Sequence, residues 1–469
     1  MSTRIKRKEA LLGVVPIGKF VFSHEDALKQ KKSIFGKLDQ WKVKYTAIED
    51  VLPDGMVRDQ KHVEAVAEDM KKKKVDALFI PHCNFGTEGA AAMIAKKVGV
   101  PVLLWAPRDE APLQDGSRLR DSLCGMFATS KVLHKLKVPF TYLENCRIEE
   151  DMFKRGLLDF VRSATVVKAL KTMKLAQIGV RIDFFWTTII NESELLDKFG
   201  IEILPVDIYD FIVKVKARAE KSKMAYGKEL PGIRKWLKIE GLSSDQPLIN
   251  TLALRDELKD LADSEGLDAI SIKSFTSIQD ALEGGCGLAY SQISDDFPII
   301  EESDIHGAVT SVLLEAAAHN GLPSFFPDIT IRHPENDNAV LLWHASAPLS
   351  LKHPESDIKM APPWILKGLP AVSLHFRLMD GPLTLARFDG DDGRYRLGCG
   401  EGRTVTGPHT NEFYAWMEVD DWPHWEKTLM QGPYIHHSSV VYDHCADVLE
   451  EACKYIPGLD IERLEKNRS

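Results

Sequence analysis

The first third of the chain alternates short apolar runs with charged amphipathic stretches. The stretches, such as DQKHVEAVAEDMKKKK, carry apolar positions at helical spacing. Continuous apolar strands separated by helices are typical of a parallel sheet that is covered on both faces. We therefore predict a doubly wound, flavodoxin-like α/β domain over residues 1–172. Its strands are expected at residues 11–17, 42–48, 75–81, 100–107 and 139–143.

The alternation resumes after a long helical pattern at residues 147–173, and it predicts a second doubly wound α/β domain over residues 173–325. Apolar runs predict strands at 175–182, 201–207 and 268–274, and helical spacing predicts helices around 192–199, 209–224, 248–264 and 304–319.

The pattern of residue types changes after about residue 325. Helical periodicity fades, and Gly, Pro, His and aromatic residues become more frequent around AVLLWHAS, AVSLHFRL, GPLTLARF, RYRLGCGEG and SSVVYDH. The turn signals Asp389-Gly390 and Asp392-Gly393 separate two of these pieces as in a hairpin. We predict a third, mainly β domain over residues 326–469, a barrel that ends with a helix at 446–455.

Composition limits the number of domains, the kinds of partner and the cellular location that we expect for this protein. A chain of 469 residues with 44% hydrophobic residues and a net charge of -9 is expected to form two to four domains without a basic face for nucleic acid. The apolar run near the N-terminus is broken by Pro16 and Lys19, so we interpret it as a strand rather than a signal peptide. No run approaches the roughly 20 apolar residues of a membrane span. Seven scattered cysteines without a CxxC pair favour a reducing, cytoplasmic location.

Nucleotide motifs are missing from the sequence. There is no P-loop, no GxGxxG, no GxSxG and no HExxH. The segment NFGTEGAAAMIAKK at 84–97 follows a strand and opens a helix, which could hold an anion on free amides. It lacks the Walker lysine, and a Gly-rich turn with a helix cap explains it more simply.

A set of carboxylates and imidazoles is the remaining candidate chemistry. Glu302 and Asp304 precede the 304–319 helix, and the other members lie in strand-like runs: Asp328 in FFPDITIRH, His344 in LLWHAS, and His436 and His437 in GPYIHHSSVV. Singly, each could be a helix cap or a satisfied core residue. Together, two carboxylates and one or two imidazoles suit Mn²⁺, Fe²⁺, Co²⁺ or Zn²⁺. Spacing alone leaves open whether the groups meet in space.

Five pieces in order carry a resemblance to a known family: GVRIDFFWTTIINESELLDKFGIEILPVD, EESDIHGAVTSVLL, FFPDITI, LLWHAS and HHSSVVYDH. Through them the chain resembles the L-fucose isomerase and L-arabinose isomerase superfamily, in particular its shorter fucose-isomerase-like members. None of the pieces lies in the first domain. The resemblance implies two α/β domains followed by a β barrel, trimers or hexamers with active sites at subunit contacts, and a divalent metal, for which we expect Mn²⁺.

The same resemblance assigns roles to the candidate residues. Glu302 and Asp328 would bind the metal and move the proton, and His437, with His436 as the alternative, would complete the ligand set. His344 resembles an additional ligand of the arabinose isomerases. No catalytic role is expected for two neighbours of Glu302: Asp304 is predicted to cap the helix, and Glu301 is predicted to face solvent.

The implied reaction is aldose–ketose isomerisation through a cis-enediol, which a metal that chelates O1 and O2 of the sugar would favour. Substrate-binding candidates are Trp186, Asn191, Glu192, Trp343 and His436, and Trp105 could also pack on a sugar. The substrate could be a deoxy or 6-modified hexose such as fucose or sulfoquinovose, or a pentose. An anionic sugar could pair with Arg108, Arg181, Lys273 or Arg387.

Two other functions stay open at this point. A metal-dependent sugar aldolase could use the same enediolate site, and a non-catalytic sugar-binding protein could close two α/β lobes on its ligand. Product analysis separates the aldolase from the isomerase. Loss of binding, rather than loss of turnover alone, in a Glu302→Gln variant would favour the binding protein.

Overall fold

The computed structural model describes residues 9–239, 242–274, 276–284, 286–363 and 373–466. The chain forms two compact units, Lys8–Lys168 and a second unit that begins at Ala169. The division falls within the long helix α6 (Asp151–Lys171), close to the boundary predicted from the sequence.

The first unit contains a five-stranded parallel sheet in the order β2-β1-β3-β4-β5. This is the strand order of flavodoxin-like folds, so the prediction of a parallel α/β sheet is confirmed, with a strand inside each of the five apolar runs. The strands are β1 (Leu12–Val14), β2 (Tyr45–Thr46), β3 (Ala77–Pro81), β4 (Val102–Trp105) and β5 (Thr141–Tyr142).

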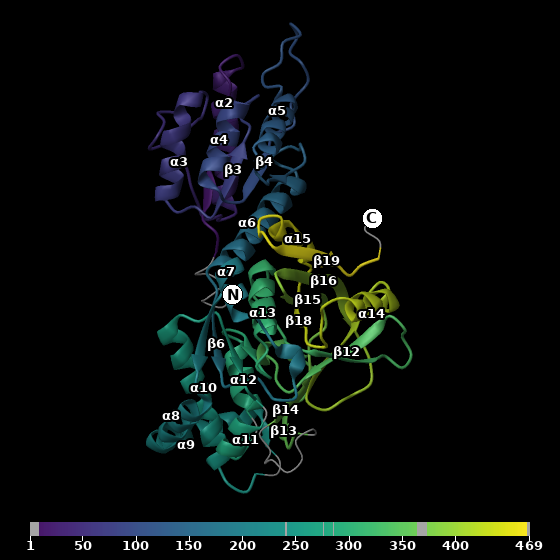
Figure 1. The fold of residues 1–469 in the computed structure, drawn as a ribbon. Coiled ribbons are helices and arrows are strands. Elements are labelled where there is room, and N and C mark those ends of the chain that lie inside the picture. Colours follow the sequence, from purple (N-terminus) through teal and green to yellow (C-terminus); the bar gives the residue numbers. More distant parts are fainter. Residues whose placement is uncertain (1–8, 240–241, 275, 285, 364–372, 467–469) are drawn as a thin grey trace. The chain divides into compact units, whose positions relative to one another are not determined.

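Helices cover this sheet because its strands are apolar on both sides. Besides α6, they are α2 (His24–Gln40), the short 3-10 helix η1 (Gln60–His62), α3 (Val63–Lys72), α4 (Glu88–Val98) and α5 (Ser122–Lys135). Helices α3, α4 and α5 lie side by side (Figure 1). Trp105 is fully buried here, with its ring centroid 4.2 Å from that of Phe153. It is a core residue and not a surface for packing a sugar.

The second unit begins with a four-stranded parallel sheet in the order β10-β9-β6-β7, which confirms a second α/β region. Its strands are β6 (Lys174–Ile178), β7 (Glu202–Val206), β9 (Ala269–Ile272) and β10 (Ile299–Ile300). Its helices are η2 (Trp186–Thr188), α7 (Glu192–Phe199), α8 (Ile208–Lys221), α9 (Lys223–Trp236), α10 (Gln246–Glu265), α11 (Ser277–Leu282) and α12 (Gly287–Ser294). The two-residue β10, the helix α9, which contains Pro231, and the short helices α11 and α12 were not predicted.

The rest of the second unit is built on a mixed 10-stranded sheet. Its strands are β8 (Lys238–Ile239), β11 (Asp328–Arg332), β12 (Ala339–His344), β13 (Lys359–Ala361), β14 (Ser373–Arg377), β15 (Pro382–Asp391), β16 (Arg394–Val405), β17 (Phe413–Glu418), β18 (Ser439–Val441) and β19 (Leu459–Arg463). The short helix η3 (Leu349–Leu351), α14 (Trp422–Gln431) and the predicted terminal helix α15 (Ala446–Cys453) complete it.

The mixed sheet differs from the predicted barrel. Its main path runs β18-β15-β16-β17-β14-β13-β8, and among the described strands its two ends do not pair, so no closed barrel is found. Strand β8 comes from the region assigned to the second domain, and it pairs in parallel with β13. The predicted hairpin is confirmed, since β15 and β16 pair from Pro382↔Arg403 to Asp391↔Arg394. The first two residues of AVSLHFRL lie outside the described residues.

Helix α13 (Ile305–Ala317) links the two sheets of the second unit. Every residue of this helix is buried, as its almost uniformly apolar sequence requires. It packs against β6, β9 and β10 of the parallel sheet and against β15 and β18 of the mixed sheet. Its first turn therefore lies where the ends of both sheets meet, which is where the candidate ligands are found.

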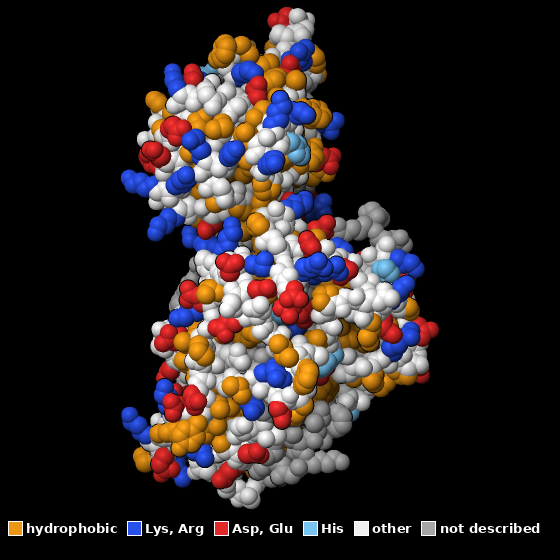
Figure 2. Space-filling model, viewed as in Figure 1, with side chains coloured by type: hydrophobic (Ala, Val, Ile, Leu, Met, Phe, Trp, Pro, Cys, Tyr) orange, Lys and Arg blue, Asp and Glu red, His pale blue; other side chains and the backbone are white. Residues whose placement is uncertain are grey.

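On the face shown in Figure 2, acidic and basic side chains are interspersed, and no extended basic region is seen there. Within the described ranges, no helix has both the length and the apolar character needed to cross a bilayer.

Candidate active site

Strand ends bring the candidate residues together. Asp328 opens β11, His344 closes β12, and His437 lies two residues before β18. The pairing Asp328↔Trp343 places β11 beside β12, and an isolated antiparallel bridge joins Asp328 to His437. The Ile329 amide also donates to the carbonyl of His436 at 2.8 Å. Backbone pairing therefore fixes three separate segments next to one another before any side-chain chemistry is considered.

Glu302 reaches the same place through an unusual turn between β10 and α13. Glu302 and Ser303 both have left-handed backbones, with φ of 63° and 58°. Such conformations in non-glycine residues cost on the order of 1–3 kcal/mol each and persist only where neighbours hold them. Here the Glu302 amide donates to Ser274 Oγ at 3.0 Å, and the Ser303 amide donates to the Ile272 carbonyl at 3.1 Å. The end of β9 thus holds the turn that directs the Glu302 carboxylate.

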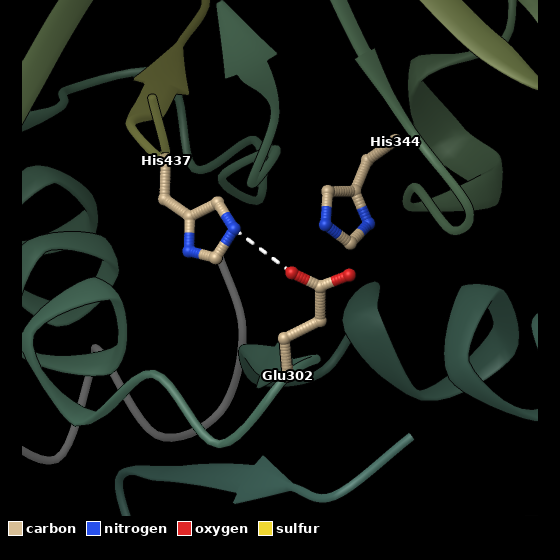
Figure 3. A group of neighbouring side chains, drawn as sticks. All are labelled: Glu302, His344 and His437. Atoms are coloured by element: carbon tan, nitrogen blue, oxygen red, sulfur yellow. Dashed lines mark ion pairs between the residues drawn. The ribbon is translucent and has the colours of Figure 1, made fainter. Parts of the chain in front are cut away.

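The Glu302 carboxylate points toward the rings of His437 and His344, and its ion pair with His437 is marked in Figure 3. His437 Nε2 lies 2.9 Å from Glu302 Oε2 and 3.5 Å from Asp328 Oδ1. Glu302, His344 and His437 offer ligand atoms within 4.8 Å of one another, and so do Asp328, His436 and His437. The residues named from the sequence as ligands therefore lie in two overlapping groups that share His437.

The buried polar atoms of this group suit a metal ion. Within the described part of the chain, the buried Asp328 Oδ1 has no hydrogen-bond partner, and the buried ring atoms His344 Nδ1 and His437 Nε2 each face a carboxylate oxygen, of Glu301 at 3.3 Å and of Glu302 at 2.9 Å. His437 Nδ1 faces Asp304 Oδ2 at 2.9 Å, and a proton on Nδ1 leaves a lone pair on Nε2. That lone pair then faces the Glu302 carboxylate, which is repulsive unless a cation or a second proton lies nearby. Mixed carboxylate and imidazole ligands suit Mn²⁺, Fe²⁺, Co²⁺ or Zn²⁺, so the residues present fit a divalent metal.

Excess negative charge also shifts the pKa values in the site. Burial alone would lower the pKa of His437, but the carboxylates of Asp304 and Glu302 outweigh burial and raise it to about 9. At His344, burial would also lower the pKa, but Glu301 and Asp328 outweigh burial and raise the pKa to about 10. Burial would raise the pKa of Glu302, yet contact with His437 lowers it. The same surplus of carboxylates that holds protons on these rings would attract a metal cation.

Asp304 caps α13, as predicted, and also makes further contacts. Its Oδ1 accepts from the Gly307 amide at 2.8 Å, and Arg387 pairs with both of its oxygens. The Arg387 Nε atom also donates to Asp389 Oδ2 at 2.9 Å. Arg387 was a candidate for binding an anionic sugar, but it is buried and paired with two carboxylates of its own chain.

The expectation that Glu301 faces solvent is wrong. Glu301 is 4% exposed, accepts a hydrogen bond from Ser346 Oγ at 2.5 Å, and lies 3.3 Å from His344 Nδ1. A charged tetrapeptide at a helix start resembles a solvated cap in sequence. The left-handed turn at Glu302 and Ser303 instead lets Glu301 and Asp304 approach different histidines.

The residues predicted to contact the sugar differ in their exposure and in their distance from the ligand groups. His436 is half-exposed, with Nε2 3.9 Å from Asp328 Oδ1. Trp186 lies in η2 and is 75% exposed, while Asn191 accepts from the Glu194 amide as the cap of α7, and Glu192 is exposed. Trp343 donates to the Asn411 carbonyl and packs in a core cluster with Leu341, Tyr414 and Trp416. Trp186, Asn191, Glu192 and Trp343 are not members of the ligand groups.

Two family models match parts of the chain, and the second match includes His437. Residues 13–171 match the fucose/sulfoquinovose isomerase N-terminal domain, and residues 367–462 match the L-fucose isomerase C-terminal domain. The chain is a fucose-isomerase-like protein. The N-terminal match falls in the region where the sequence pieces gave no resemblance, and both families are families of ketol isomerases.

Relatives of this fucose-isomerase-like chain include proteins named sulfoquinovose isomerase. A sulfoquinovose isomerase from Priestia aryabhattai is 25% identical over 447 residues, which cover 93% of this chain and 95% of that protein. A sulfoquinovose isomerase from Alkalicoccus urumqiensis is 25% identical over 276 residues, or 58% and 60% of the two chains. A periplasmic solute-binding protein from Actinobacillus succinogenes with bound D-allose covers 66% of this chain and 91% of its own at 12% identity. Its TM-score of 0.17 is too low to indicate a shared fold.

Two aromatic residues that lie beside the site histidines of this fucose-isomerase-like protein were not among the candidates named from its sequence. The Phe326 ring centroid lies 5.1 Å from that of His437 and 5.2 Å from that of His344. The Phe185 centroid lies 6.1 Å from His437. Phe326 stands two residues before Asp328, and that adjacency is the signal that could have identified it. The rings restrict water around the imidazoles, which strengthens the electrostatic interactions there.

Proposed function

We propose that the protein is a metal-dependent aldose–ketose isomerase that interconverts a sugar aldose and its ketose through a cis-enediol or enediolate. One observation carries the proposal. Ligand atoms of Glu302, His344 and His437 lie within 4.8 Å of one another, and Asp328 Oδ1 lies 3.5 Å from the shared His437 Nε2. The two isomerase family models and the sulfoquinovose isomerase relatives support the reaction class.

Glu302, Asp328, His437 and His344 would hold the metal, and the family resemblance makes Mn²⁺ the first choice among the ions that suit oxygen and nitrogen donors. A bound divalent ion would polarise the sugar oxygens O1 and O2 and stabilise the negative charge that develops on them. In this proposal His436 is the half-exposed imidazole that contacts the sugar.

Glu302 and Asp328 would also act as the general acid and base. Both carboxylates lie near one imidazole nitrogen, at 2.9 and 3.5 Å, so they approach the same small volume from different elements. One carboxylate can remove the proton from C2 of the aldose, and the proton can be returned to C1.

The proposed substrate is a 6-modified hexose such as sulfoquinovose, which the names of the relatives support. Fucose or a pentose are the alternatives. Arg181 and Lys273 follow β6 and β9, the strands whose ends lead toward the turn at Glu302, and neither forms an ion pair with the described residues. Arg181 donates to three carbonyls of its own loop, those of Ile182, Asp183 and Phe185. Trp186 lies on the same loop and remains a candidate sugar contact.

We also propose a cytoplasmic homo-oligomer, a trimer or hexamer, as the working form. The oligomer rests on the family resemblance and the location on the scattered cysteines, and analytical ultracentrifugation of the purified protein would test the oligomer.

The reaction itself is tested by proton NMR in D₂O. Purified protein with Mn²⁺ is incubated with sulfoquinovose, L-fucose and a panel of other aldoses. The proposal expects deuterium at C2 together with the ketose, and EDTA should abolish both. A Glu302→Gln variant should lose exchange, whereas Asp337→Asn, which alters an exposed acid, should retain it. Absence of exchange in protein shown to hold metal would refute the isomerase, and triose products would indicate the aldolase instead.

A further inference from the structure

We propose that Asp304 is a positioning residue for the metal site, because its carboxylate holds the Nδ1–H of His437 and so directs the Nε2 lone pair toward Glu302 and Asp328. This inference rests on the metal site of the proposed function. It assigns Asp304 a role beyond capping α13.

The contacts of Asp304 leave its carboxylate little freedom. The residue is fully buried, and its Oδ1 accepts from the Gly307 amide at 2.8 Å and from Arg387 Nη2 at 3.2 Å. Its Oδ2 accepts from Arg387 Nη1 at 2.5 Å and from His437 Nδ1 at 2.9 Å. Four donors from three separate elements thus fix both oxygens, and one of these donors is the imidazole.

An imidazole needs such a partner to act as a ligand through one defined nitrogen. A neutral histidine carries its proton on either ring nitrogen, and the hydrogen bond at one nitrogen decides which of them is free. The backbone of His437 is held by its bridge to Asp328, and Phe326 packs against the ring. The ring position is therefore set by packing, while Asp304 sets the tautomer. Partners of this kind commonly change metal affinity by 10–100-fold when they are removed.

The helix cap alone would not require a carboxylate at this position. Ser, Thr or Asn can cap a helix as well as Asp, and the cap uses only Oδ1. Arg387 also has a second carboxylate, Asp389, whose Oδ2 lies 2.9 Å away. The oxygen that contacts His437 is therefore the part of Asp304 that the helix cap leaves unexplained.

The test measures metal affinity in Asp304→Asn against Asp389→Asn. Asparagine keeps the helix cap but cannot accept from His437 Nδ1 with a charged oxygen. Asp389→Asn removes the other carboxylate of Arg387 without touching His437. Mn²⁺ dissociation constants come from electron paramagnetic resonance of the free ion. The absorption bands of bound Co²⁺ report the geometry of the ligands, which a change in stability alone would not alter.

We expect Asp304→Asn to bind Mn²⁺ about 10–100-fold more weakly and to change the Co²⁺ bands. Asp389→Asn should bind almost as the wild type does. If Asp304→Asn fails to fold, Asp304→Ser keeps a residue that can cap α13, leaves Arg387 paired with Asp389, and should show the same loss. An unchanged dissociation constant in Asp304→Asn, or equal losses in both single variants, would overturn this inference alone. Failure of the wild type to bind either metal would overturn the proposed metal site as well.

Discussion

Asp328 and His437 stand opposite each other in an isolated antiparallel bridge, and the Nε2 atom of His437 lies 3.5 Å from Asp328 Oδ1. The bridge is made by backbone atoms, so it brings the two side chains together whatever their chemistry. A substitution that keeps the size of either side chain should therefore leave the local fold intact. This separates chemical from structural effects at the site.

Asp328→Asn should abolish turnover while leaving the protein folded. The amide has the same shape as the carboxylate but can neither accept the substrate proton nor supply its charge to a metal, and a general acid or base contributes about 10²–10⁴-fold. We expect kcat to fall by at least that range, measured by ketose formation, with unchanged thermal unfolding in EDTA. Asp337→Asn is the control. Near-normal kcat in Asp328→Asn would remove this residue from the mechanism.

Metal removal should destabilise the folded protein. Without a cation, the carboxylates around His437 repel one another, and a ligand that binds only the folded state stabilises it by mass action. At a free Mn²⁺ concentration of 100 Kd the gain is about 2.7 kcal/mol. Thermal unfolding with EDTA and with Mn²⁺ measures the difference.

His437→Gln should lose the response to Mn²⁺, whereas His319→Gln, which alters an exposed histidine, should retain it. An equal upward shift of Tm in wild type and His437→Gln would mean that Mn²⁺ binds elsewhere on the protein.

The parallel strands were predictable because strands buried on both faces are short continuous apolar runs. The two-residue strand β10 is too short to form such a run, and Pro231 obscured helix α9. The barrel was predicted from the strand content of the third region. Sequence periodicity does not reveal which strands pair, and β8 joins this sheet from residues about one hundred positions earlier.

The ligand set could be named from its residue types and the family resemblance, whereas its supporting contacts could not. Glu302 and Ser303 are not residues that signal a left-handed turn, so the inward direction of Glu301 was invisible in the sequence. Asp304 and Arg387 are 83 residues apart, and nothing in either segment indicates that they pair. Only the packing of α13 between the two sheets brings them together.

Gly307→Ala should destabilise the site. A methyl group at Gly307 would meet Phe326 Cε2 at 2.5 Å and Asp304 Cγ at 3.1 Å. Because Phe326 packs on His437 and His344, it cannot move away without displacing them, and overpacking of this kind costs about 1–3 kcal/mol. Denaturant unfolding and the Mn²⁺ dissociation constant should both show the loss.

Gly36→Ala provides the matched control for this substitution. Gly36 also lies inside a helix, α2, but no atom lies within 4 Å of the methyl group it would gain. Alanine is favoured over glycine there by about 0.5–1 kcal/mol, so this variant should be slightly more stable. If both variants were equally stable, the close approach of α13 to Phe326 would not constrain the site.

Glu315→Gln should make the protein more stable at alkaline pH. Glu315 is buried in α13, and burial raises its pKa to about 7, although Ser324 donates to the carboxylate from both its amide and its hydroxyl. The unfolded pKa is 4.5, so between pH 4.5 and 7 the folded state holds more protons than the unfolded state and stability falls as pH rises. Glutamine accepts the same hydrogen bonds without charge. Urea unfolding should show the variant more stable than wild type by up to about 3 kcal/mol at pH 8, with little gain at pH 4. A constant difference at the two pH values would show that Glu315 does not titrate in this window.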